Sequence, residues 1–412
     1  MNRRVVVTGM GVISPLGNTV LEFWESLCKG KSGIDTITRF DITDFSTKFA
    51  GCVDNFDPED YMDKKDARRM DRYTHYAMAA TRMAMQEANF DMKQIDKERL
   101  GVVLGTGVGG IETMEEQKEK LISRGPGRIS PFFVPMMISN MAAGQIAIAI
   151  EAKGVNTTVV TACASATNAI GEAYRMIKDD RADVIVAGGS EAAVTPLALA
   201  GFCAMRALST RNEDPKGASR PFDKDRDGFV MGEGAGILIL EDYEHAIKRD
   251  ANILAEVVGY GLTADAYHIT APASEGEGAA RAMALAIQDA GIEPNMIDYI
   301  NAHGTSTPYN DEFETMAIKT VFGDHAYKLC ISSTKSMTGH LLGASGGIEA
   351  VATVLSLVNQ YVHPTINYET ADPNCDLDYV PNNGRKTNIQ YAISNSFGFG
   401  GQNASLLFKR FD

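Results

Sequence analysis

A cysteine at the end of a strand-like run is the first candidate for chemistry in this sequence. Cys163 follows the β-branched run Thr157–Thr161 and precedes small residues that are typical of a closely packed helix. A thiol at a helix N-terminus meets exposed N–H groups and the positive end of the helix dipole, and both favour the thiolate. Cys163 is therefore a candidate nucleophile, with a buried, inert cysteine as the equal alternative.

Two histidines stand in comparable places. His303 follows an apolar strand-like run, and His340 closes the segment S-S-T-K-S-M-T-G-H ahead of an apolar helix. Glu349, the only charged residue of that helix, needs a partner, and Lys335 and a bound cation are the two candidates. Either histidine alone could simply be hydrogen-bonded in a turn. Side chains at strand ends meet at one edge of an α/β sheet, however, so both are expected near Cys163.

The segment N-S-F-G-F-G-G-Q-N near the C-terminus has glycines at 398, 400 and 401. Glycine lets the backbone approach a ligand closely and direct N–H groups at it, although a flexible turn is the alternative. A cysteine, two histidines and such a turn together indicate nucleophilic thioester chemistry.

Strand-like and helix-like segments alternate along the chain, which favours an α/β fold with strands buried between helical layers. The expected strands are Arg4–Thr8, Leu100–Leu104, Thr157–Thr161, Val184–Ala187, Ala235–Leu240, Leu254–Tyr260, Tyr299–Ala302, Cys330–Ser333 and Tyr391–Ser394. The expected helices are Asp66–Ala88, Ala164–Lys178, Glu277–Ala290, Asp311–Val321 and Ser345–Val358.

A weak internal duplication accompanies this alternation. Thr157–Thr161 leads through Cys163 into a helix, and Cys330–Ser333 leads through His340 into another. Two similar halves would place both reactive turns at their junction. The seam is expected near residue 250, which gives an N-terminal half 1–250 and a C-terminal half 251–412 packed as one body.

Composition excludes several classes of function. A net charge of −14 over 412 residues argues against nucleic acid and anionic membranes as partners. The six cysteines form no C-x-x-C pair and show no zinc spacing. The apolar run at the N-terminus is too short for a signal peptide, and no stretch is expected to reach transmembrane length, so a cytoplasmic location is predicted.

One basic cluster stands out on this acidic chain. Its members are spaced to share one face of a helix, with aspartates between them: Lys64, Lys65, Arg68, Arg69 and Arg72. An ordinary solvated face is one interpretation. A docking site for an acidic protein is favoured, because the rest of the chain would repel such a partner.

The motifs as a set resemble one family. T-A-C-A-S-A around Cys163, N-A-H-G-T-S-T around His303, S-S-T-K-S-M-T-G-H and N-S-F-G-F-G-G are similar to the β-ketoacyl-acyl-carrier-protein synthases, most of all to the synthase II type of bacterial fatty-acid synthesis. V-V-V-T-G-M-G near the start and R-P-F-D-K-D-R-D-G-F-V-M-G-E-G-A at 220–235 extend the likeness to the whole chain. It implies a thiolase fold of two duplicated halves in five αβαβα layers, assembled as a homodimer.

The resemblance also implies a reaction, the decarboxylative Claisen condensation of acyl and malonyl carrier protein. Cys163 takes the acyl chain from its carrier protein, with the N–H groups of Cys163 and Phe399 as oxyanion hole. Neutral His303 and His340 stabilise the enolate left when the malonyl group loses CO₂. The products are 3-oxoacyl carrier protein, CO₂ and free carrier protein. No cofactor is required beyond the phosphopantetheine that the substrates carry.

Further residues match family positions. Lys335 is expected to hold His340, and the supporting charges are Asp311, Glu314 and Glu349. A structural cation is implied near Asn301, Glu349, Ser394 and Asn395. Thr270, Thr305 and Thr307 would bind the pantetheine arm. The acyl tunnel would include Val108, Phe202 and, across the dimer, Phe133, with Gly398 and Gly400 in a mobile gate. Carrier-protein docking would use Lys64, Lys65, Arg68, Arg69 and Arg72 with Arg128 and Arg206.

Of four related activities, the thiolase and the initiating synthase are disfavoured, and the polyketide ketosynthase and the chain-length factor are kept as alternatives. A thiolase would need a second cysteine in a glycine-rich turn, and none is present. The initiating type of synthase carries asparagine where one of the two histidines stands here. A stand-alone polyketide ketosynthase shares all these motifs. A non-catalytic chain-length factor lacks the nucleophile, whereas Cys163 is present.

Overall fold

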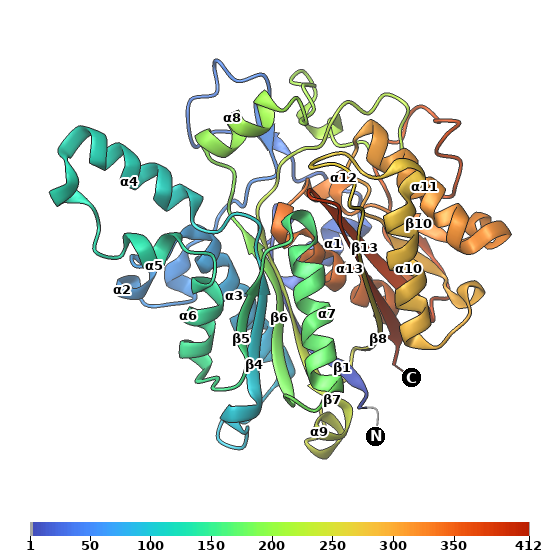
Figure 1. Cartoon of the computed structure of the whole chain (residues 1–412), viewed down its shortest axis with the longest axis horizontal. Coiled ribbons are helices and arrows are strands. Elements are labelled where there is room, and N and C mark those ends of the chain that lie inside the picture. The colour runs from blue at the N-terminus through green and yellow to red at the C-terminus, as the bar shows by residue number, and fades with distance from the viewer. Residues whose placement is uncertain (1–2, 412) are drawn as a thin grey trace.

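A computed structural model describes residues 3–411 and contains one ten-stranded sheet made of two five-stranded halves (Figure 1). The first half comprises β1 (Val5–Ile13), β4 (Leu100–Gly105), β5 (Asn156–Val159), β6 (Val184–Glu191) and β7 (Gly234–Asp242). The second comprises β8 (Ala255–Ala264), β9 (Tyr299–Asn301), β10 (Cys330–Ser332), β13 (Tyr391–Gly398) and β14 (Gln402–Arg410).

The two halves share one topology. Their strand orders are β5-β4-β6-β7-β1 and β10-β9-β13-β14-β8, so each half follows the same path. In both, the first three strands are parallel and the last two pairings are antiparallel. Val5–Val7 of β1 pairs with Ala255–Val257 of β8 and joins the halves. The predicted duplication is confirmed, while the boundary at residue 250 stays a prediction.

Helices form three layers around the half-sheets. The central layer is α7 (Ser165–Lys178) and α13 (Ser345–Asn359), which pack against each other and against strands of both halves. On the outer faces, α3 (Arg72–Ala88) and α6 (Met141–Ile150) cover the first half, and α10 (Glu277–Ala290) and α11 (Pro308–Phe322) cover the second. These five layers are the αβαβα arrangement that the family resemblance predicts.

Smaller elements complete the chain. The remaining helices are α1 (Val20–Cys28), α2 (Lys64–Ala67), α4 (Ile111–Arg124), α5 (Phe133–Met137), α8 (Pro196–Ala204), α9 (Tyr243–Lys248) and α12 (Lys335–Thr338). Two short pairs, β2 (Asp35–Thr36) with β3 (Phe49–Ala50) and β11 (Tyr361–Val362) with β12 (Arg385–Lys386), lie outside the main sheet. The helix α4 extends away from the body (Figure 1).

The central layer corrects one expectation. The stretch Leu342–Asn359 is long and apolar enough to cross a membrane, with a mean hydropathy of 1.3, although no such stretch was expected. In the structure 89% of it is buried inside the protein. A helix enclosed by both half-sheets is apolar on every side because no face of it meets water.

The expected helix Asp66–Ala88 is also wrong in part, because it is broken into α2 and α3. The carboxylate of Asp71 accepts a hydrogen bond from the N–H of Tyr73 and caps the start of α3. The spacing of the basic cluster therefore does not place it on one helical face. Arg72 is further committed to a bidentate ion pair with Glu112.

Candidate active site

Corresponding turns of the two halves carry the candidate nucleophile and one candidate histidine. In the first half, Ala162 has a positive φ of 50° directly before Cys163, and α7 begins at Ser165. In the second half, Leu342 has a φ of 49° shortly after His340, and α13 begins at Ser345. A non-glycine residue in this left-handed region costs ~1–3 kcal/mol, so both turns hold strained backbone. Because α7 and α13 pack together, the duplication brings the two turns to the same place.

A cavity of about 600 Å³ opens at this junction. Cys163, His303 and His340 all line it, and their exposed fractions are 9%, 2% and 3%. The ring centroids of His303 and His340 lie 5.4 Å apart, and Phe397 contacts the His303 ring edge-on. The three side chains that the sequence places far apart are thus brought together in one enclosed space.

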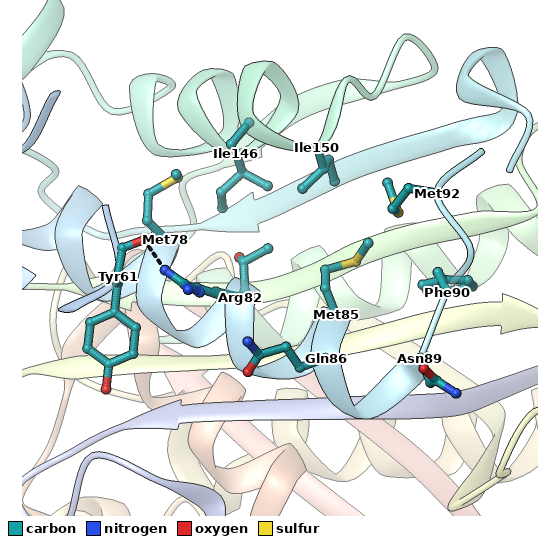
Figure 2. A pocket seen from close by; sticks show the side chains of 12 residues that line it. Tyr61, Met78, Arg82, Met85, Gln86, Asn89, Phe90, Met92, Ile146 and Ile150 are labelled. Carbon is teal, nitrogen blue, oxygen red and sulfur yellow. Dashed lines mark hydrogen bonds between the residues drawn. The ribbon is translucent and has the colours of Figure 1, made fainter. Parts of the chain in front are cut away.

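A second cavity, of about 520 Å³, lies on the outer face of the first half (Figure 2). Met78 and Met85 of α3 and Ile146 and Ile150 of α6 form much of its wall. No cysteine or histidine lines it, so it is separate from the candidate active site.

Burial dominates the protonation state of Cys163. It raises the pKa of the thiol to about 12, against the opposing effects of the Lys335 charge and a hydrogen bond from the Phe399 N–H. The helix start was expected to favour thiolate, and here desolvation outweighs it. Cys163 is therefore a thiol at neutral pH and must lose its proton as it attacks.

His303 is held as a neutral donor. Nζ of Lys335 lies 3.3 Å from Nδ1 of His303 and also forms an ion pair with Glu349. An ammonium can only donate, so Nδ1 accepts and the ring proton of a neutral His303 sits on Nε2. Burial, followed by the charges of Lys335 and His340, lowers the pKa of His303 well below 6.5. Lys335 was expected to hold His340, but its ammonium group contacts His303 instead.

His340 is fixed by different partners. Its backbone N–H donates to the carbonyl of Val230 at 2.7 Å, and its Nδ1 lies 2.8 Å from the hydroxyl of Ser345. When that hydroxyl donates, the ring proton of His340 is also on Nε2. Burial and the Lys335 charge lower the pKa of His340 well below 6.5. Both imidazoles are therefore neutral across the physiological range.

The glycine-rich turn approaches the nucleophile closely. A Cβ on Gly398 would lie 2.7 Å from the carbonyl oxygen of Thr161 and 3.1 Å from the backbone nitrogen of Cys163. Only glycine permits this approach, which brings the Phe399 N–H to the sulfur of Cys163. Two backbone N–H groups, of Cys163 and Phe399, are thus available at one point, as an oxyanion hole requires.

Buried carboxylates hold the backbone around His303. The N–H groups of His303 and Gly304 donate to the two carboxylate oxygens of Glu314, each at 2.8 Å. Burial raises the pKa of Glu314 to about 7. Asp311 accepts a hydrogen bond from the Phe222 N–H at 2.8 Å. These two expected supporting charges therefore hold backbone rather than the imidazole rings.

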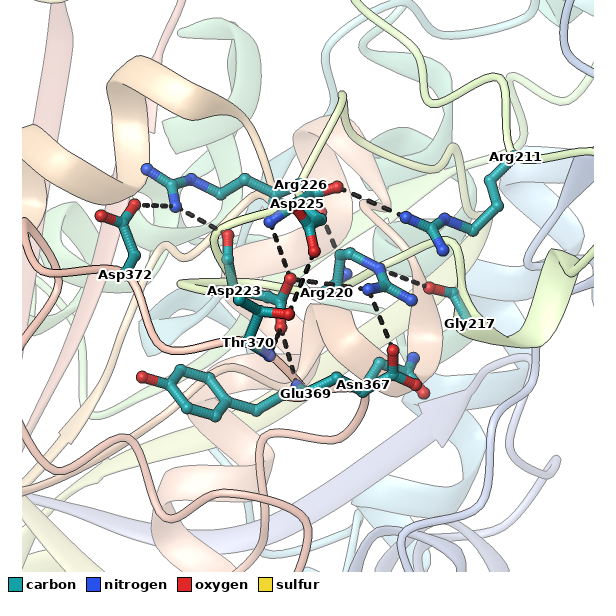
Figure 3. A network of polar contacts seen from close by, with 12 residues as sticks. Arg211, Gly217, Arg220, Asp223, Asp225, Arg226, Asn367, Glu369, Thr370 and Asp372 are labelled. Atoms are coloured by element: carbon teal, nitrogen blue, oxygen red, sulfur yellow. Dashed lines mark hydrogen bonds and ion pairs between the residues drawn. The ribbon is translucent and has the colours of Figure 1, made fainter.

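Arg226 belongs to a network of polar contacts with Asp223 and Asp372 (Figure 3). The guanidinium of Arg226 donates to the carbonyls of Thr307 and Pro308 at 3.2 and 2.9 Å and pairs with Asp372 at 2.6 Å. The hydroxyls of Thr305 and Thr307 are 2.9 Å apart, and both residues line the cavity. The sequence motif R-P-F-D-K-D-R thus acts by fixing the position of the threonines.

Most of the expected binding residues line the same cavity: Thr270, Thr305, Thr307, Val108, Phe202, Gly398 and Phe399. Gly400 and Phe133 do not line it, and Phe133 lies on α5. Of the seven docking candidates only Arg206 lines the cavity. Lys64 pairs with Glu59, and Arg69 lies over the ring of Phe132.

The implied cation site fits the oxygens present. Oδ1 of Asn301, Oε2 of Glu349 and Oγ of Ser394 are buried without a hydrogen-bond partner, and Asn301 and Ser394 are neighbours across β9 and β13. Oxygen-only donor sets of this kind suit a hard cation. Oδ1 of Asn395 already accepts from the Ser405 hydroxyl. Within residues 3–411 no group of three or more His, Cys, Asp or Glu residues forms a metal site.

Sequence reasoning missed two residues of this site. Ser345 holds His340, and Phe397 contacts His303. The position of Ser345 at the start of an apolar helix was the available signal, because serine is a frequent residue at helix starts. Phe397 sits inside the glycine motif but carried no separate signal.

Family models and relatives agree with this geometry. Residues 2–246 match the model "Beta-ketoacyl synthase, N-terminal domain", and residues 254–369 match "Beta-ketoacyl synthase, C-terminal domain". A curated relative from Synechocystis sp., named 3-oxoacyl-[acyl-carrier-protein] synthase 2, is 55% identical over 99% of this chain and 98% of its own. One of the same name from Staphylococcus aureus is 56% identical over 100% and 99%.

Solved structures show the same fold. A chain of a type II polyketide synthase acyl-carrier protein in complex with its ketosynthase bound to the hexaketide superposes with a TM-score of 0.93 at 40% identity. A β-ketoacyl synthase from Burkholderia phymatum superposes with a TM-score of 0.92 at 36% identity. Both matches cover 100% of each chain. With two matching domain models and full-length relatives, the chain belongs to the β-ketoacyl synthase family.

Proposed function

We propose that this chain is an elongating condensing enzyme of fatty-acid synthesis, which condenses the acyl group of one carrier protein with the malonyl group of another through an acyl-Cys163 intermediate. The observation that carries the proposal is the convergence of Cys163, His303 and His340 on one cavity. The full-length relatives named 3-oxoacyl-[acyl-carrier-protein] synthase 2 support the same reaction.

In the first half-reaction, Cys163 attacks the acyl thioester. The S–C bond forms as the thiol proton leaves, and the phosphopantetheine sulfur departs carrying that proton, as a free thiol. The N–H groups of Cys163 and Phe399 stabilise the oxyanion of the tetrahedral intermediate. Loss of one such donor typically lowers the rate by about 10²–10³-fold.

In the second half-reaction, the malonyl thioester loses CO₂ and its enolate attacks the acyl-Cys163 carbonyl. The Nε2–H groups of His303 and His340 donate to the enolate oxygen. A neutral donor suits this task, because a charged imidazolium would bind the anionic malonyl ground state tightly and lower the barrier less. The C–S bond then breaks, the Cys163 thiolate takes up a proton from solvent, and the 3-oxoacyl product leaves two carbons longer.

The substrates reach the site on acyl carrier protein, the partner present in the related ketosynthase complex. Thr270, Thr305 and Thr307 line the polar part of the cavity and would meet the pantetheine arm. Arg206 at the cavity is the best placed of the basic docking candidates. The cluster at residues 64–69 would add long-range attraction for an acidic carrier.

We also propose a homodimer. The strand β5 ends the sheet on one side, and Val160 next to it is 56% exposed. An unprotected strand edge can pair with the same edge of a second copy under twofold symmetry. Such pairing would cover the turn before Cys163 and give Phe133 access to a neighbouring cavity.

The proposed chemistry needs no resident metal or organic cofactor, because decarboxylation itself supplies the carbanion. A cation held by Asn301, Glu349 and Ser394 would supply charge balance around Lys335 and Glu349. Its role is therefore structural in this proposal.

The test is a series of acyl carrier proteins of different chain length with malonyl carrier protein, following both 3-oxoacyl product and CO₂. The wild type is expected to form product, and Cys163→Ala is expected to form none. Cys163→Gln is expected to release CO₂ without condensation, because both imidazoles remain. If no acyl-Cys163 forms with any chain length, the chain is a non-catalytic partner instead. Extension of the product by repeated rounds without reduction would favour the polyketide alternative.

A further inference from the structure

A buried carboxylate that the mechanism does not use lies beside the acyl end of the cavity. Glu191 is the last residue of β6 and has no exposed surface. Its Oε1 accepts hydrogen bonds from the Thr106 hydroxyl at 2.9 Å and from the N–H groups of Val108 and Gly109 at 3.1 and 3.3 Å. Its Oε2 accepts from the N–H of Gly107 at 2.6 Å and of Gly343 at 3.0 Å.

The nature of these partners fixes the protonation state of Glu191. All five are donors, and a carboxyl group that only accepts is ionised. Burial raises the pKa of Glu191, and hydrogen bonds from the N–H groups of Gly107, Val108 and Gly343 and from the Thr106 hydroxyl oppose that shift. The charge is thus balanced by backbone dipoles rather than by a cation, as in the anion-binding concavities that successive N–H groups form.

The five donors come from two segments that shape the cavity. Thr106, Gly107, Val108 and Gly109 form the loop after β4, and Gly343 belongs to the turn that follows His340. Val108 and Leu342 line the cavity, and Leu342 belongs to an apolar cluster with Phe202. One carboxylate therefore ties together both walls of the apolar end.

The fit around Glu191 leaves no room for adjustment. A Cβ on Gly107 would lie 2.8 Å from Oε2 of Glu191, and a Cβ on Gly343 would lie 2.6 Å from it and 2.1 Å from the backbone nitrogen of Gly107. Two glycines and the carboxylate are thus packed against one another. A change at any of the three must move the loop that carries Val108.

We propose that Glu191 is a positioning residue that sets the length of acyl chain the cavity accepts, by holding the loop that carries Val108 against the turn that carries Leu342. This rests on the proposed function, since it assigns a specificity to the same site. Glu191 does not line the cavity, so it acts through the loop and not by touching substrate.

The test is Glu191→Gln, which keeps the side-chain shape but turns an NH₂ group toward donors. The measured quantity is the ratio of kcat/KM for a long and a short acyl carrier protein, expected to change at least about tenfold, the lower end of the range by which apolar pockets discriminate one methylene. The KM for malonyl carrier protein is expected to stay the same, because Thr305 and Thr307 belong to another loop. A purely structural loss would lower all rates together.

Glu233→Gln is the matched control. Glu233 is equally buried but is held by Arg39, the Val53 N–H and the Tyr76 hydroxyl, away from the cavity. It is expected to lose stability with an unchanged chain-length ratio. Thr106→Val removes one donor to Glu191 and decides the question if Glu191→Gln fails to fold, with a smaller shift of the ratio expected.

An unchanged ratio in every folded variant of Glu191 and Thr106, or a shift no larger than that of Glu233→Gln, overturns the proposal. Absence of condensation by the wild type with every chain length would instead overturn the proposed function.

Discussion

Nζ of Lys335 lies 3.3 Å from Nδ1 of His303, so the ammonium group of one residue sets the tautomer of the other. The same ammonium forms a buried ion pair with Glu349. Lys335 thus serves a catalytic imidazole and a structural charge at once, and the two roles can be separated by mutation.

Lys335→Met is expected to lower malonyl decarboxylation about 10²-fold, the typical effect of a misdirected oxyanion donor. It also leaves Glu349 buried without its partner, which typically costs about 3–5 kcal/mol of unfolding free energy. The double variant Lys335→Met/Glu349→Gln is expected to recover stability without recovering the rate. CO₂ release and denaturant unfolding measure the two effects. Recovery of the rate in the double variant would contradict the tautomer role.

The two neutral histidines make stability depend on pH. Their native pKa values lie well below the ordinary 6.5, so the unfolded chain takes up protons first as the pH falls. Their contribution to the free energy of unfolding is complete above about pH 6.5. It is lost progressively as the pH drops from there toward the native pKa values. We expect Tm to fall below about pH 6.5. His303→Gln/His340→Gln should show a shallower fall, and an equal slope in both proteins would be evidence against neutral histidines.

Over the same range the decarboxylation rate should stay flat in protein that remains folded, because the imidazoles keep their N–H groups neutral. Initial CO₂ release by Cys163→Gln at stepwise lower pH measures this. A rate that halves near the ordinary histidine pKa would show that one ring becomes protonated in the native state.

The raised pKa of Cys163, about 12, predicts how the free thiol reacts. Alkylation by iodoacetamide should increase steadily up to about pH 9 without a plateau, because thiolate is the reacting species. Mass spectrometry of the Cys163 peptide against pH gives the curve. A plateau near neutral pH would mean that the helix start, and not burial, dominates.

Gly398→Ala should damage the oxyanion hole. Its Cβ would lie 2.7 Å from the Thr161 carbonyl, so the turn must move and carry the Phe399 N–H away. Formation of acyl-Cys163 is expected to slow about 10²-fold. The control is Gly201→Ala, where no atom lies within 4 Å of the new Cβ. Equal acylation rates in the two variants would remove Phe399 from the mechanism.

The unpartnered oxygens of Asn301, Glu349 and Ser394 predict cation binding. After dialysis against a chelator, adding back Na⁺, K⁺ or Mg²⁺ one at a time should raise Tm for at least one ion, since a ligand that binds the native state stabilises it. Asn301→Ala should abolish that rise. If none of the three ions changes Tm, the predicted cation site is wrong.

Local pattern predicted much of the fold. The helix Glu277–Ala290 was placed at its observed bounds, because Gly291 ends it in a left-handed cap. The strand β14 was missed, since its residues follow directly after the glycine turn and read as part of it. The break at Asp71 depends on its contacts with Tyr73 and Thr113, and the second of these lies far along the chain.

The site likewise has features that the sequence predicts and features that depend on tertiary packing. Motif order pointed to Cys163, His303 and His340, whose convergence the structure shows. The protonation of Cys163 was not predictable, because burial by both halves outweighs the local helix start. The pairing of Lys335 with His303 likewise depends on a tertiary contact between α12 and the loop after β9, which no local spacing encodes.

The duplicated turns have a consequence for how this site could diversify. Counting from the strained residues Ala162 and Leu342, the nucleophile Cys163 corresponds to Gly343 in the other copy. In a symmetric dimer of identical chains, every mutation changes both turns together. Joined in one polypeptide, one turn is free to keep a sulfur while its counterpart becomes bare backbone, whose N–H group donates to Glu191 instead.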